Sequence, residues 1–172
     1  MFTNKKNANQ PRDDLQSIYP RLWRYCLVLT GSNHQADDLA QTASLQAIEK
    51  SHQFKVGTHF DRWLFTITRR LWINELRKQS VRTGGGISSI EELDLPDNKP
   101  GPETNLYTHQ VLLEVMALPE AQRSTVLLAY VEGYSYKEVA EILEIPIGTV
   151  MSRLSTARTQ LAGKMKNTGD VV

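Results

Sequence analysis

The segment Gly133–Leu161 limits the possible folds most, because it predicts two short helices joined by a tight turn. Ser135 can cap the first helix with its hydroxyl, and Glu138, three residues later, completes a capping-box pattern. Pro146 has no N–H and cannot continue that helix, while Thr149 can cap a second one. Apolar residues recur at helical spacing along both: Val139, Ala140 and Leu143, then Val150, Leu154, Ala157 and Leu161. This layout is typical of a helix-turn-helix.

The outward positions of the second helix are small, polar or cationic: Met151, Ser152, Arg153, Ser155, Thr156 and Arg158. A helix that enters the major groove of DNA needs such side chains, so these positions and Thr149 are candidate DNA contacts. An ordinary helical hairpin would show the same pattern. The rest of the chain has to decide between the two interpretations.

Charge is distributed unevenly, although the formal net charge of the 172 residues is only +1. From Lys55 to Arg82, seven Lys and Arg oppose two acids, a local charge of +5. From Thr83 to Thr104, five acids oppose one Lys, a local charge of −4, and this stretch also holds four Gly and three Pro. Its composition is typical of a flexible linker.

Helical periodicity on both sides of that linker predicts an all-α protein of two small domains. Three helices are expected before the linker, the third from about Phe60 to Lys78, and further helices at Leu106–Met116 and Pro119–Glu132. The expected organisation is a mobile tail at 1–14, a first domain at 15–82, an acidic linker at 83–104, a second domain at 105–166 and a tail at 167–172. Two sets of residues suit the buried faces of the first two helices: Ile18, Leu22, Tyr25, Cys26 and Leu29, then Ala36, Leu39, Ala40, Ala43, Ala47 and Ile48.

The third helix carries a second candidate nucleic-acid surface. Projected at about 100° per residue, its core face is Phe60, Leu64, Ile67 and Leu71. The opposite face is a cationic stripe of Arg62, Thr66, Arg69, Arg70 and Arg77, which Phe65 and Trp72 are expected to flank. Cations attract phosphates, and neighbouring aromatics can stack on unpaired bases, so this surface suits separated strands. A solvated cationic face, with Trp72 packed on a neighbouring helix, is the alternative.

Four stretches in this order resemble bacterial RNA polymerase sigma factors of the small extracytoplasmic-function type. They are ADDLAQ (36–41), FDRWLFTITRR (60–70), LPEAQRSTVLLAYVEGYSYKEVAEIL (118–143) and IPIGTVMSRLSTAR (145–158). The resemblance implies that the first domain is sigma region two and the second is region four. It implies docking on the largest polymerase subunit through Asp37, Asp38 and Gln41.

The resemblance also implies roles for the two candidate nucleic-acid surfaces. The second helix of the helix-turn-helix would read the minus-thirty-five promoter element. The segment Lys55–Arg77 would open the minus-ten element, and its implied contacts are Lys55, Phe60, Arg62, Phe65, Thr66, Arg69, Arg70, Trp72, Asn74 and Arg77. The expected partners are core RNA polymerase, promoter DNA and an anti-sigma protein.

The sequence offers no motif for catalysis, a metal or a cofactor. Its four histidines are scattered without Cys partners, and no phosphate-binding loop or nucleophile motif is present. We therefore expect a non-catalytic protein without a small-molecule substrate. The single Cys26 and the polar start predict a cytoplasmic protein without membrane insertion.

Two other functions stay open. A sigma-like decoy would bind only an anti-sigma protein. That alternative stays open because the family usually has other residues at the positions of Thr42 and Ser44. A stand-alone helix-turn-helix repressor would leave the first ninety residues unexplained.

Overall fold

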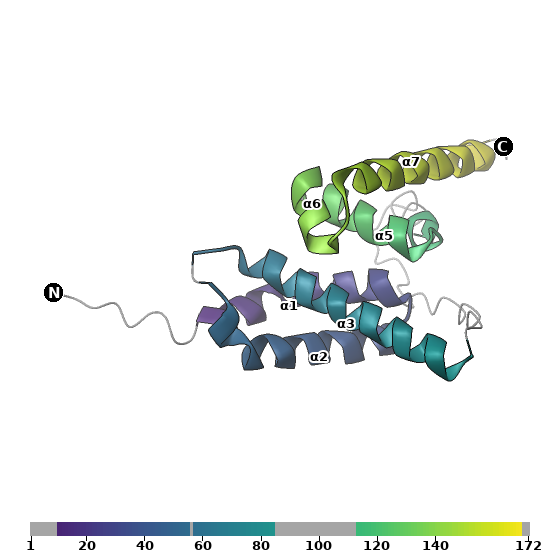
Figure 1. The fold of residues 1–172 in the computed structure, drawn as a ribbon. Coiled ribbons are helices and arrows are strands. Elements are labelled where there is room, and N and C mark those ends of the chain that lie inside the picture. Colours follow the sequence, from purple (N-terminus) through teal and green to yellow (C-terminus); the bar gives the residue numbers. More distant parts are fainter. Residues whose placement is uncertain (1–9, 56, 85–112, 170–172) are drawn as a thin grey trace, which may run out of the picture.

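The computed structural model describes residues 10–55, 57–84 and 113–169, with side chains for 14–55, 57–84 and 113–163. Every regular element of this described part is helical, which confirms the predicted all-α class. The first domain packs three long helices side by side (Figure 1). Its elements are α1 (Gln10–Thr30), α2 (Asn33–Glu49), a short 3₁₀ turn η1 (Ser51–Gln53) and α3 (Phe60–Arg82).

The second domain lies over the first and contacts it through α1 and α3 (Figure 1). After helical residues 113–116 it contains α5 (Glu120–Val126), the π-helical segment η2 (Leu127–Val131), α6 (Tyr136–Leu143) and α7 (Ile147–Gly169). The expected single helix Pro119–Glu132 therefore changes its winding after Val126, and a π-segment is often found where a helix serves a functional contact.

Several predicted boundaries need correction. Helix α1 begins at Gln10, inside the expected tail, and a proline such as Pro11 is compatible with a first helical turn. At the other end α7 runs to Gly169, so that tail too is partly helical. Most of the predicted linker, 85–104, lies outside the described residues.

Thr149 does not cap α7, contrary to the prediction. The helix begins at Ile147, and the backbone N–H groups of Thr149 and Val150 donate to the Pro146 carbonyl at 2.9 and 3.3 Å. Helix α6 has already ended at Leu143, with Glu144 in the left-handed conformation as its C-cap, and the carbonyl of Pro146 accepts the first backbone bonds of α7.

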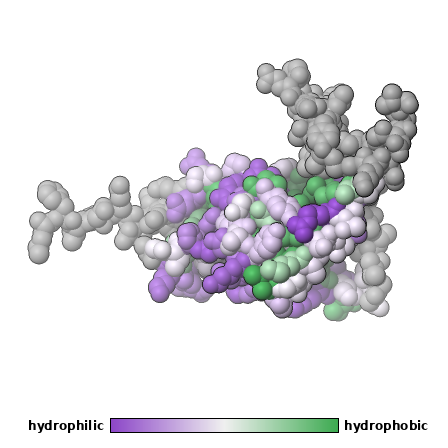
Figure 2. Space-filling model, turned by 90° about the horizontal axis from the view of Figure 1, so that it is seen from above, coloured by the Kyte–Doolittle hydropathy of each residue, from purple (hydrophilic) through white to green (hydrophobic). Residues whose placement is uncertain are grey.

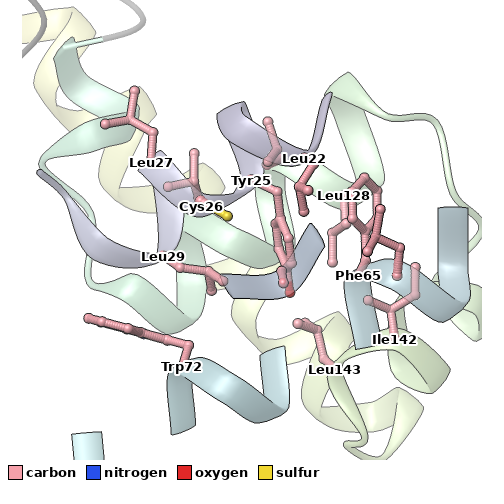
Figure 3. Close-up of a cluster of buried hydrophobic side chains, with 14 of the residues drawn as sticks. Leu22, Tyr25, Cys26, Leu27, Leu29, Phe65, Trp72, Leu128, Ile142 and Leu143 are labelled. Atoms are coloured by element: carbon pink, nitrogen blue, oxygen red, sulfur yellow. The ribbon is translucent and has the colours of Figure 1, made fainter. Parts of the chain in front are cut away.

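One hydrophobic core extends through both domains. Tyr25 and Phe65 of the first domain lie near Leu128 and Ile142 of the second, and none of the four side chains is more than 1% exposed (Figure 3). The faces predicted for α1 and α2 are buried as expected, except that Ile48 is only half-buried. Because the domains share a core, part of each domain's surface is covered by the other.

The predicted capping box at the start of α6 is present. The Glu138 N–H donates to Ser135 Oγ at 3.3 Å, and the Ser135 N–H donates to Glu138 Oε2 at 2.8 Å. Replacing Ser135 with alanine should lower the free energy of unfolding by about 1 kcal/mol, because the backbone N–H of Glu138 in the first turn of α6 would lose its hydrogen-bond acceptor. Urea denaturation followed by circular dichroism measures this. Ser155→Ala, in the exposed middle of α7, is the control, and an equal loss in both variants would contradict a capping role.

Candidate nucleic-acid interface

The predicted contacts of the first domain divide into accessible and covered residues. Lys55, Arg70, Asn74 and Arg77 are exposed, and Arg62 and Thr66 are half-buried. Phe60, Phe65, Arg69 and Trp72 are buried. The structure therefore keeps a cationic face on α3, but only part of it is open in this arrangement of the domains.

The helical projection predicted that Phe65 and Trp72 flank the cationic stripe, but both are buried instead. Phe65 is 0% exposed; its ring centroid lies 4.9 Å from that of Tyr25 in α1 and 6.2 Å from that of Tyr134 in the second domain. Trp72 is 8% exposed. The projection allowed α3 one buried face, whereas this helix is covered by its own bundle and by the second domain.

Trp63 is the aromatic residue that the sequence analysis missed. It is half-buried, and its ring lies 5.3 Å from Phe54 and 5.7 Å from Phe60 between centroids. Together with His59, Arg62 and Thr66 it lines a cleft of about 250 Å³, whose opposite side is Glu141 and Ile142 of α6. The sequence feature that could have identified Trp63 as a candidate contact is its position directly after Arg62. Trp63 thus offers the ring beside the cations that Phe65 was expected to supply.

Carboxylates of the second domain pair with the arginines of α3. Arg69 lies 2.8 Å from Glu120. Arg70 donates to Glu144 through two guanidinium nitrogens, at 2.5 and 3.1 Å. Arg62 lies 3.3 Å from Glu138 and 3.7 Å from Glu141. The hydrogen bond with Glu144 raises the pKa of Arg70, and the same bond lowers the pKa of Glu144. The ions therefore stay charged together.

A second polar contact joins α1 to the segment after η2. The Arg21 guanidinium lies 2.5 Å from Glu132 and donates to the Tyr134 hydroxyl at 2.9 Å, while Arg24 lies 2.7 Å from Glu132. Tyr134 donates a short hydrogen bond to Asp61. Burial by itself would raise the pKa of Asp61, but this bond, the Arg62 N–H and the Arg21 charge together lower it.

The outward face of α7 is mostly exposed. Met151, Ser152, Ser155, Thr156 and Arg158 lie on it. Val150, Leu154 and Ala157 are 0% exposed, as the periodicity predicted. Figure 2 looks down on the second domain and shows hydrophobic and hydrophilic residues interspersed over its surface. Ile147 and Thr159 are exposed at the same helical spacing and were not predicted as contacts.

Arg153 is not an outward residue in this structure. It is half-buried, its Nη1 atom is buried, and it lies near the Arg69–Glu120 pair, so that burial, followed by the Arg69 charge, lowers its pKa. Thr149 is half-buried as well. The contact between the domains, absent from any projection of α7 alone, accounts for the position of Arg153.

The residues predicted to dock on polymerase lie together on α2. Asp37, Asp38 and Gln41 are all exposed, and Leu45, one turn further along, adds an apolar side chain that is 62% exposed. The indole N–H of Trp23 donates to Asp37 at 2.7 Å and so holds that carboxylate in place. The face combines acids, an amide and an apolar group.

The described residues include no group of three or more His, Cys, Asp or Glu that could hold a metal ion. None of the helices searched has the length and apolar character of a membrane span. Cys26 is 0% exposed, and burial raises the pKa of its thiol to about 12. The predicted buried thiol is confirmed.

Comparison with known proteins matches both domains. The family model of sigma-70 region 2 covers residues 15–82, and that of sigma-70 region 4 covers residues 108–161. ECF RNA polymerase sigma factor EcfG of Rhodopseudomonas palustris is 30% identical over 151 residues, which are 88% of this chain and 82% of that protein. ECF RNA polymerase sigma factor SigW of Bacillus subtilis is 26% identical over 95% of this chain and 93% of its own length.

A solved structure shares the arrangement of the domains. The sigma factor RpoE of Bartonella quintana, solved in complex with the anti-sigma factor NepR, superposes with a TM-score of 0.78 at 26% identity over 92% of this chain and 98% of that one. CnrH, solved with the cytosolic domain of CnrY, has the same fold, with a TM-score of 0.63 at 18% identity over 94% of this chain and 91% of that one. Two matched regions in the predicted order and the similarity to EcfG show that the chain belongs to the family of ECF RNA polymerase sigma factors.

Proposed function

We propose that this protein is a non-catalytic specificity subunit that brings core RNA polymerase to promoters in the cytoplasm. The exposed face of α2 docks on the polymerase, α7 reads the minus-thirty-five element, and the cationic face of α3 holds the opened minus-ten element. The observation that carries this proposal is the pairing of regions 2 and 4 in one chain, each with an exposed surface of suitable chemistry.

The chemistry of each surface suits a different one of the three proposed contacts. The α7 face presents hydroxyls, a thioether and Arg158, which can contact base edges in the major groove. The α3 face presents arginines beside Trp63, and a ring next to cations suits phosphates and unstacked bases. The α2 face has no such cations between Asp37 and Leu45, so it suits a protein partner.

A protein inhibitor is part of the proposal. The RpoE structure is a complex with an anti-sigma factor, and the CnrH structure is a complex with the cytosolic domain of CnrY. The present chain has the same two-domain fold, so we expect a protein partner of this kind for it as well.

In vitro transcription with core polymerase and a genomic promoter library tests the proposed function. Transcripts that require this protein should share two spaced upstream elements. Replacing Ser152 and Thr156 together with alanine should change the preference for one upstream element over another about tenfold, because each good base contact contributes about 1–3 kcal/mol of discrimination. Binding to core polymerase should not weaken.

Ser17→Ala with Ser80→Ala makes a similar hydroxyl-to-alanine change at two exposed positions of the first domain and should leave promoter preference unchanged. Absence of protein-dependent transcripts together with absence of core binding would support the decoy. Binding to a palindrome without polymerase would support the repressor.

A further inference from the structure

The ion pairs between the two domains all have the same polarity. Within the described residues, every such pair joins an arginine of the first domain to a glutamate of the second. The arginines are Arg21, Arg24, Arg62, Arg69 and Arg70, and the glutamates, which we name the carboxylate clasp, are Glu120, Glu132, Glu138, Glu141 and Glu144. The first domain, residues 15–82, has ten Lys and Arg against five acids, whereas the second, residues 105–166, has six of each, so the net charge of the second domain does not explain why only its glutamates lie at the contact.

The clasp offers arginine the same chemistry as a DNA backbone. Carboxylates and phosphates both accept paired hydrogen bonds from a guanidinium, as Glu144 does from Arg70 at 2.5 and 3.1 Å. The side chain of Arg69, which pairs with Glu120 at 2.8 Å, is only 9% exposed. A phosphate cannot reach Arg69 while Glu120 holds it.

We propose that the second domain is an internal competitor of DNA for the first. In the closed arrangement the carboxylate clasp occupies the arginines of α3, and strand binding requires the domains to separate. The inference rests on the proposed role of α3 and adds its regulation. Lys55, Asn74 and Arg77 lie outside the clasp and stay exposed, so the closed form keeps only part of the strand-binding surface.

The closed arrangement also covers part of the second domain. Arg153, predicted as a DNA contact of α7, lies half-buried beside Arg69 and Glu120. Opening the clasp would therefore free cations on both domains. The cleft between α3 and α6, with Trp63 on its wall, would open in the same movement.

Weakening the clasp should strengthen DNA binding by the isolated protein. The variant Glu120→Gln with Glu144→Gln keeps the size of both side chains and removes two ion pairs with α3. The full-length variant should bind a fluorescein-labelled 20-nucleotide single strand about tenfold more tightly than the wild type at 0.1 M salt, because the apparent affinity rises with the fraction of open molecules. Its radius of gyration from small-angle scattering should also increase.

Asp14→Asn with Glu49→Gln is the matched control, with the same change of two charges at residues outside the clasp. It should bind the strand as the wild type does, and circular dichroism checks that both variants keep their helices. Equal strand affinity in the clasp variant and the control would overturn the inference. The assay contains no polymerase, so an absence of promoter-directed transcripts would reject the proposed function without affecting this result.

Discussion

Replacing Phe65 with alanine is expected to lower the free energy of unfolding by about 3–5 kcal/mol. The ring is 0% exposed and packs against Tyr25 and Tyr134, so its loss leaves a cavity where α1, α3 and the second domain meet. Aromatic pairs of this kind contribute beyond the burial of their area. Urea denaturation followed by circular dichroism measures the loss.

Val81→Ala is the control on the same helix, because Val81 is 83% exposed and its removal leaves no cavity. The comparison separates two functions of an aromatic residue in α3. If Phe65→Ala unfolds at the same urea concentration as Val81→Ala, Phe65 is a surface residue in solution, and the projection that placed it beside the cationic stripe describes the protein better than the closed structure does.

Replacing Arg123 with methionine should lower the free energy of unfolding by about 3 kcal/mol, a typical cost when one partner of a buried polar network is lost. Arg123 is 8% exposed and donates to the carbonyls of Val28 at 2.7 Å, Met116 at 2.9 Å and Leu118 at 3.4 Å. Methionine fills much of the space but leaves these carbonyls without their donor. Burial lowers the pKa of Arg123, and the Glu120 charge partly offsets this.

Arg77→Met provides the matched control, since Arg77 is exposed at the end of α3 and should change stability by less than about 0.5 kcal/mol. Val28 belongs to the first domain, whereas Met116 and Leu118 belong to the second. The Arg123 variant should therefore also increase the radius of gyration. A stability equal to that of the Arg77 variant would show that water replaces the guanidinium without cost.

Local signals explain why the helix-turn-helix could be predicted from the sequence. The cap at Ser135, the break at Pro146 and the apolar stripe Val150, Leu154 and Ala157 depend only on neighbours along the chain. The same holds for the buried face of α2. The error at Thr149 has a local cause too, because Pro146 and Thr149 are both good helix starts, and the proline carbonyl accepts the first backbone bonds.

The family motifs identified the two regions, but they did not predict which surface residues of each region are covered by the other. The four matched stretches predicted a sigma factor, and the comparisons confirm that family. They say nothing about which arginines are paired. That property belongs to the contact between the domains, since Arg69 and Glu120 are 51 residues apart in the chain.

The sequence by itself thus determined the helix-turn-helix with its cap at Ser135, the buried faces of α1 and α2, and the family. Only the tertiary structure decided that Phe65, Trp72 and Arg69 are buried, that Arg153 turns toward the first domain, and that Trp63 lines the cleft. Helical periodicity reports one buried face per helix, because it arises from the repeat of a single helix. A second buried face, created when another domain packs on α3, has no period of its own in the sequence.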